Sequence, residues 1–110
     1  MLGIIGAMDE EVAMIKAQLT DVQVETRAAM DFYKGKLEGK EVVVVRSGIG
    51  KVNAAVCTQI LADIYGVTGV VNTGIVGSLK AEIDIGDIVL SSDALQHDMD
   101  ATGFGYEPGQ

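Results

Sequence analysis

The 110-residue sequence is poor in cysteine, proline and positive charge, and these shortages exclude several classes of protein. Its single cysteine, Cys57, cannot form an internal disulfide, and no cysteine–histidine cluster indicates a zinc site. Eight lysines and arginines against 16 aspartates and glutamates give a net charge of −8, which would repel nucleic acids and anionic membranes. No apolar run reaches the roughly 18 residues of a membrane span. We therefore expect no nucleic acid, membrane, metal ion or cofactor partner.

What the sequence does contain is typical of a folded protein of the cytoplasm. Apolar residues make up 48% of the chain, which excludes disorder and is enough to bury a core. The N-terminal stretch 1–8 is apolar, but it lacks a basic leading segment and runs directly into three acidic residues. We therefore expect that this stretch is not a secretory signal peptide. Fourteen glycines against one proline predict many tight turns.

Apolar patterning predicts an α/β fold with a mixed central sheet flanked by helices. Continuous apolar runs indicate buried strands, and apolar residues three and four apart indicate helices. Gly39 is expected to supply the positive φ of a hairpin turn. Asp9 is the predicted N-cap of the first helix, and Gly66 is the predicted C-cap of the second helix. The predicted strands cover residues 2–5, 30–37, 41–46, 67–72 and 83–90, and the predicted helices cover residues 9–19 and 51–65.

The C-terminal part of the sequence predicts a long loop. Residues 93–110 are polar and glycine-containing and offer no closing helix or strand, which is uncommon inside a compact domain. Although the length suits one ordinary domain, we expect residues 1–110 to be the N-terminal portion of a larger α/β domain that is incomplete at its C-terminus.

Three consecutive carboxylates follow the first predicted strand, where ligands bind in open α/β sheets. Asp9 is expected to cap the helix, and Glu10 points about a third of a turn away from the inward stripe. Glu11 lies three residues after Met8 and four before Ile15, so it is the carboxylate best placed to face a cleft and act as a general base. The alternative is that all three serve the helix dipole and solubility.

Two glycine-containing segments also follow predicted strands. Residues 47–51 (Ser-Gly-Ile-Gly-Lys) match neither the P-loop nor the dinucleotide-binding pattern, so a simple turn is the favoured interpretation over phosphate binding. Gly74 and Gly77 follow a buried run and suit either a sugar or base contact or a turn. In the last loop, His97 beside Asp98 is a weak metal candidate, and Phe104 with Tyr106 suits a partner surface or a ligand lid.

Taken in order, these segments resemble the bacterial 5′-methylthioadenosine/S-adenosylhomocysteine nucleosidases, which have a nucleoside phosphorylase-like fold. No single segment is decisive, but the ordered set is specific and spreads over the whole sequence. The segments that carry the resemblance are 3–12, 47–52, 72–74 with Gly77, 86–89, 97–98 and 104–107.

The resemblance implies hydrolysis of the bond between adenine and ribose, without a cofactor. It assigns the activation of water to Glu11, and it implies a homodimer in which a loop of one subunit covers the alkylthio group in the other. The substrate-binding positions that it implies are Met8, Ile49, Ile75, Val76, Gly77 and, in that loop, Ala101 and Phe104.

The sequence departs from the family in two respects. Many relatives have a serine that orients the water where this chain has Ile75. Family members are also about twice as long, beyond the size of one short domain, and their second half supplies an aspartate that protonates adenine. We therefore expect the 110-residue segment alone to be inactive. A related adenine nucleosidase acting on aminofutalosine, a nucleoside phosphorylase and a non-catalytic nucleoside-binding module remain the alternatives.

Overall fold

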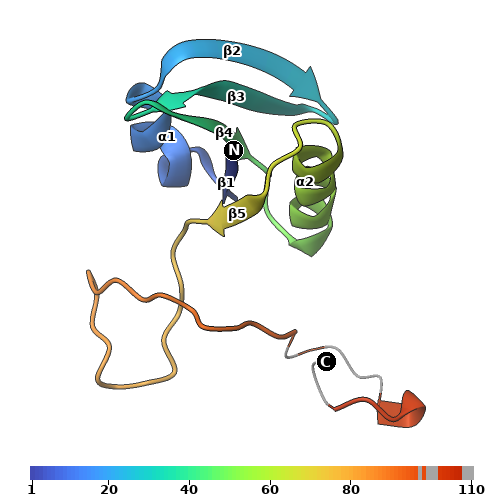
Figure 1. Ribbon diagram of the computed structural model, residues 1–110. Coiled ribbons are helices and arrows are strands. Elements are labelled where there is room, and N and C mark those ends of the chain that lie inside the picture. Colours follow the sequence, from blue (N-terminus) through green and yellow to red (C-terminus); the bar gives the residue numbers. More distant parts are fainter. Residues whose placement is uncertain (97, 99–101, 108–110) are drawn as a thin grey trace. The chain divides into compact units, whose positions relative to one another are not determined.

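The computed structural model describes residues 1–96, 98 and 102–107 (Figure 1). The chain forms two compact units, residues 1–77 and residues 78–110. Within the described residues, the first unit contains the sheet and the α-helices, and the second contains one short 3₁₀ helix. In chain order the elements are β1 (Leu2–Gly6), α1 (Asp9–Ala17), β2 (Thr20–Arg27), β3 (Met30–Leu37), β4 (Lys40–Arg46), α2 (Lys51–Asp63), β5 (Gly69–Asn72) and the 3₁₀ helix (Thr102–Phe104).

The strands form one mixed sheet in the order β2-β3-β4-β1-β5. β1 pairs in parallel with β4, where Leu2 lies opposite Val42, and in parallel with β5, where Leu2 lies opposite Gly69. β2, β3 and β4 pair in antiparallel fashion. This topology confirms the predicted α/β fold with a mixed central sheet.

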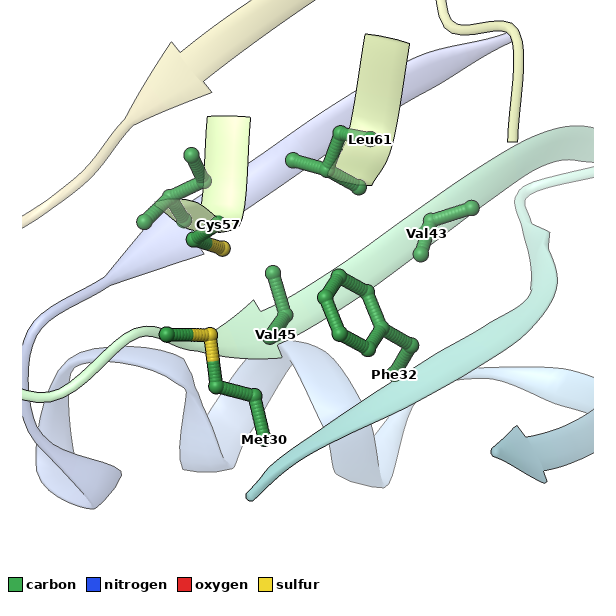
Figure 2. Packing of buried hydrophobic residues seen from close by; sticks show 7 residues of the cluster. Met30, Phe32, Val43, Val45, Cys57 and Leu61 are labelled. Carbon is green, nitrogen blue, oxygen red and sulfur yellow. The ribbon is translucent and has the colours of Figure 1, made fainter. Parts of the chain in front are cut away.

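The two helices cover opposite faces of this sheet, because neighbouring residues of a strand point to opposite sides. In β1, Ile5 packs in the cluster that holds Cys57 and Leu61 of α2, whereas Ile4 packs in the cluster that holds Val12 of α1. The first unit is therefore a helix–sheet–helix sandwich, and its core lies on both faces of β1 and β4. Figure 2 shows the α2 side of this core, to which β3 and β4 contribute Met30, Phe32, Val43 and Val45.

Both helices end slightly earlier than predicted. α1 ends at Ala17, with Gln18 as its C-cap. α2 ends at Asp63, and its C-cap is Ile64 rather than Gly66. Gly66 has a φ of +64° two residues later, so it turns the chain toward β5 instead of capping the helix. Among the described residues, no helix is long and apolar enough to cross a lipid bilayer.

Two strand predictions were wrong, for opposite reasons. No strand is predicted over residues 20–27, yet β2 lies there as an edge strand whose eight residues are all exposed. Conversely, the predicted strand over residues 83–90 is irregular chain, and its apolar residues Ile85 and Ile88 are 106% and 91% exposed. An apolar run forms a strand only where a neighbouring strand satisfies its backbone, and none of the described residues does so there.

The β2–β3 turn places two alanines in the left-handed region. Ala28 and Ala29 have φ values of +51° and +60°, the positive values that a two-residue hairpin turn needs. Each non-glycine residue in that region costs about 1 kcal/mol. The double variant Ala28→Asn/Ala29→Gly is therefore expected to raise the free energy of unfolding by about 1–2 kcal/mol, measured in urea.

The matched control lies in the neighbouring β3–β4 turn, where Gly39 has a φ of +80°, as the sequence predicts, and no atom within 4 Å of a built Cβ. Gly39→Ala adds a side chain without a clash, so it should destabilise through backbone strain alone, by about 1 kcal/mol. If both variants changed the free energy of unfolding in the same direction, the positive φ values of Ala28 and Ala29 would not be a source of strain.

The single cysteine is part of the α2 core. Cys57 is fully buried, and this burial raises the pKa of its thiol from 9.0 to about 11. Between pH 9 and 11 the unfolded chain therefore loses this proton before the folded chain does. We expect the free energy of unfolding to fall by up to about 2–3 kcal/mol across this window.

The variant Cys57→Ala isolates this contribution, because it retains every other titrating group. Urea unfolding of both proteins at pH 8.5 and at pH 11 measures the effect. The native chain should lose more stability than the variant over this interval, and parallel curves would argue against a protected thiol.

Candidate functional site

Three parallel strands end at the same edge of the sheet, where ligands bind in open α/β folds. These are β4, β1 and β5, which are neighbours in that order. Two backbone hydrogen bonds fix the segments that leave them. The N–H of Ser47, after β4, donates to the carbonyl of Gly6 at 2.9 Å, and the N–H of Thr73, after β5, donates to the carbonyl of Ile5 at 2.9 Å.

Glu11 lies at this edge in the first turn of α1. Its Oε2 accepts hydrogen bonds from the backbone N–H groups of Ala7 at 2.6 Å and Met8 at 3.0 Å. The N–H of Glu11 in turn donates to the carbonyl of Met8 at 3.1 Å. These bonds satisfy amides at the start of the helix and fix the orientation of the carboxylate.

The predicted N-cap, Asp9, is wrong by one residue. The N-cap is Met8, which has extended φ and ψ values of −127° and 157° and makes no side-chain capping bond. Glu11 takes over this function because its longer side chain reaches back to the N-cap amide from the third helical position. Asp9 lies in the first turn instead, where its Oδ1 is 3.3 Å from Nε of Arg46 and 3.9 Å from Nζ of Lys16.

The three carboxylates differ in exposure in the way that helix geometry predicts. Asp9 and Glu10 are exposed, whereas Glu11 is half-buried. Its carboxylate faces the segment after β5, since a Cβ built on Gly74 would lie 2.9 Å from Oε1 of Glu11. Glu11 therefore lies between the ends of β1 and β5, and not in bulk solvent.

An open groove of about 470 Å³ lies beside the start of α1. Met8 and Ile49, two of the predicted substrate-binding residues, line it. The loop after β4 supplies Gly48 and Ile49, and the amide of the Asn53 side chain supports this loop by donating to the carbonyl of Ile49 at 2.8 Å. The groove is lined by Ala7, Met8, Asp9, Glu10, Arg46, Gly48, Ile49 and Asn53.

Arg46 and Asn53 are groove residues that the sequence analysis missed. Arg46 is the last residue of β4, so its place at the carboxyl end of a parallel strand is the signal that points to it. Asn53 lies three residues after the N-cap Gly50 of α2, in the first turn of that helix. Arg46 gives the groove a cation, which is paired with Asp9.

Among the predicted residues of the first unit, Glu11, Ile75, Val76 and Gly77 do not line this groove. Ile75 and Val76 follow β5 and are 82% and 74% exposed, and Gly77 has open space around it. Phe104 belongs to the second unit and is 87% exposed, while Ala101 and His97 lie outside the described residues. In the part of the chain that the structure describes, no group of three histidine, cysteine or acidic side chains could hold a metal ion.

Comparison with protein families and curated proteins gives matches along the entire chain. A family model described as the phosphorylase superfamily matches residues 1–110. A 5′-methylthioadenosine/S-adenosylhomocysteine nucleosidase from Marinomonas sp. (strain MWYL1) is 52% identical over 110 residues, which are 100% of this chain and 48% of the relative. The chain thus spans about half the length of the curated relatives it matches.

Solved structures of similar proteins share the fold described above. A 5′-methylthioadenosine/S-adenosylhomocysteine nucleosidase from Colwellia psychrerythraea 34H, in complex with adenine, matches with a TM-score of 0.95 and 52% identity over 99% of this chain and 45% of its own. A futalosine hydrolase from Helicobacter pylori strain 26695 matches with a TM-score of 0.88 and 32% identity over 99% of this chain and 47% of its own.

Proposed function

We propose that this chain, which belongs to the phosphorylase superfamily, is the N-terminal portion of a nucleosidase domain. The reaction is hydrolysis of the N-glycosidic bond of 5′-methylthioadenosine and S-adenosylhomocysteine, which gives adenine and a thioribose. The observation that carries the proposal is the half-buried Glu11 carboxylate, held by the amides of Ala7 and Met8 at 2.6 and 3.0 Å where β1 ends. The names of relatives that are 52% identical support the same reaction.

Glu11 is the proposed general base. Both backbone hydrogen bonds fall on Oε2, so among the described contacts Oε1 is the oxygen left to take a proton from water. The water oxygen bonds to the anomeric carbon as the bond from that carbon to adenine breaks, and the electron pair of this bond leaves with adenine. A carboxylate near the ribose also stabilises the positive charge that develops on the ring. The resemblance assigns protonation of adenine to an aspartate in the second half of the relatives.

The apolar lining of the groove is proposed to bind the sugar and the alkylthio group. Met8 and Ile49 line the groove from the starts of α1 and α2. Ile75, Val76 and Gly77 are proposed to bind the substrate from the segment after β5. Ile75 has no hydroxyl, so a backbone group or another side chain must orient the water in this chain.

A homodimer is the proposed assembly, with Ala101 and Phe104 of one subunit covering the alkylthio group in the other. Exposed apolar side chains around the start of α2 support an interface there. Val52 and Val56, four residues apart on the helix, are 78% and 40% exposed, and Ile49 just before the helix is 74% exposed.

We also propose that the reaction takes place in the cytoplasm, as a step of methionine salvage.

Water suits this site better than phosphate as the nucleophile. A phosphorylase needs cations that converge on its phosphate. Here the described groove has Asp9 and Glu10 beside it, and the guanidinium of Arg46 lies 3.3 Å from the carboxylate of Asp9. That ion pair reduces the positive charge available to an anion.

The test is release of adenine from 5′-methylthioadenosine in phosphate-free buffer. The protein to be assayed is a chimera in which this chain is followed by the second half of the Colwellia nucleosidase. The 110-residue chain alone is the control. We expect the chimera to release adenine and the chain alone to release none. Release only with added phosphate would favour a phosphorylase, and binding without release would favour a nucleoside-binding module.

A futalosine-type nucleoside is the second candidate substrate. The match to the Helicobacter pylori futalosine hydrolase, with a TM-score of 0.88, favours it. Its identity of 32% is lower than the 52% of the Colwellia nucleosidase, so the methylthioadenosine reaction is preferred. Parallel assays of the chimera with aminofutalosine and 5′-methylthioadenosine distinguish the two by the ratio of kcat/KM values.

A further inference from the structure

The Glu11 carboxylate lies against a glycine from another part of the sheet. Gly74 follows the end of β5 by two residues, and a Cβ built on it would lie 2.9 Å from Oε1, 3.1 Å from Cδ and 3.4 Å from Oε2 of Glu11. These are the three nearest atoms to that position, so the carboxylate occupies the space that a side chain would need. Carbon and oxygen atoms that are not bonded pack at about 3.5 Å. Any side chain at position 74 therefore requires Glu11 to move.

The backbone of Gly74 does not itself require glycine. Its φ is not positive, in contrast to Gly48 and Gly50, whose φ values are +86° and +102°. An alanine could adopt the same backbone conformation without strain. What excludes the alanine is its contact with Glu11.

Gly6, the last residue of β1, is a useful contrast. A Cβ on Gly6 would lie 2.7 Å from Cγ1 of Val12 and 3.0 Å from Cβ of Glu11. Val12 is fully buried, so a side chain at position 6 would push the helix itself away from the sheet. A side chain at position 74 meets the end of one side chain, which can turn. Substitution of Gly74 should thus move the carboxylate and preserve the fold.

We propose that Gly74 is a positioning residue for Glu11, an inference that rests on the proposed function. The absence of a side chain at position 74 keeps Oε1 in place, while the amides of Ala7 and Met8 hold Oε2. In the variant Gly74→Ala the carboxylate must turn away and loses one or both of these hydrogen bonds. A misplacement of about 1 Å in a reacting group can cost 100-fold in rate. Because Gly74 acts through Glu11, kcat should fall about 100-fold, and KM should change little.

The first test measures the carboxylate position in the 110-residue chain. In ¹H–¹⁵N spectra of Gly74→Ala, the amide protons of Ala7 and Met8 should shift upfield, toward their positions in Glu11→Ala. Gly69→Ala is the matched control in β5, since its Cβ would approach only the Cδ2 of exposed Leu2, at 3.1 Å, and should leave both signals in place. Unchanged Ala7 and Met8 signals in Gly74→Ala would overturn the proposal.

If Gly74→Ala does not fold, the double variant Gly74→Ala/Glu11→Ala decides the question. Removing the carboxylate removes the three atoms nearest to the new methyl group, so the double variant should fold. Its failure to fold would show that Gly74 has a different structural role, and it would equally overturn the proposal.

The second test measures adenine release by the chimera with the Colwellia half. Gly74→Ala should lower kcat about 100-fold, but it should cost nothing further in a Glu11→Gln background, because the base is already lost. If the two substitutions lowered kcat independently, so that their effects multiplied in the double variant, Gly74 would not act through Glu11. If the unsubstituted chimera releases no adenine, the proposed function fails, whereas the amide signals still decide whether Gly74 holds the carboxylate.

Discussion

Glu11→Gln in the chimera is expected to lower kcat for adenine release by about 10²–10⁴-fold, the range that a general base contributes. An amide oxygen cannot take a proton from water at neutral pH, so the attack on the anomeric carbon loses its base. The loss should appear in kcat more than in KM, since the proton transfer occurs only as the reaction proceeds.

The same substitution should leave the fold almost unchanged. The Gln side-chain oxygen can still accept the hydrogen bonds that the amides of Ala7 and Met8 donate to Oε2 of Glu11. We expect the free energy of unfolding to fall by no more than about 1 kcal/mol, as for weakening one hydrogen bond. A large loss of rate with a small loss of stability would show that Glu11 has a catalytic role in addition to capping α1.

Glu10→Gln is the matched control. It removes the same charge from the same helical turn, but its side chain is exposed and accepts none of the hydrogen bonds of Glu11. If kcat depended only on negative charge near the start of α1, both variants would lose the same rate. Full rate in Glu11→Gln, or equal losses in the two variants, would remove Glu11 from the role of base.

The sequence was most informative where burial dictates residue type. The four valines 42–45 are all buried, because α1 and α2 cover the two faces of β4, and a continuous apolar run predicts such a strand. Helix geometry likewise distinguished Glu11 from Asp9 and Glu10, because the direction of a side chain follows from its position in the turn. The half-buried position of Glu11 agrees with that reasoning, and its catalytic role stays a prediction.

Features that depend on partners distant in sequence could not be predicted from local pattern. β2 has no apolar run because its pairing with β3 requires only backbone hydrogen bonds. Arg46 enters the groove because β4 pairs in parallel with β1, whereas the sequence indicated only its hairpin with β3. The contact between Gly74 and Glu11 likewise joins segments that are 63 positions apart by residue number, which no spacing within one element reveals.

Leu61→Ala is expected to lower the free energy of unfolding by about 2–5 kcal/mol, a large part of the total for a domain of this size. Leu61 of α2 is fully buried in the cluster shown in Figure 2. It packs directly on the backbone of β1, because a Cβ built on Gly3 would lie 2.9 Å from Cδ1 of Leu61. Its truncation therefore leaves a cavity between the helix and the central strand, which urea unfolding at pH 7 would measure.

Gly3→Ala tests the same contact from the other side. Alone, its methyl group would overpack against Leu61 and cost about 1–3 kcal/mol. In a Leu61→Ala background the methyl group would enter the vacated space instead, so the double variant should be more stable than the sum of the single losses predicts. If the two losses were simply additive, Leu61 would not contact Gly3. In that case α2 would pack against β1 through other residues.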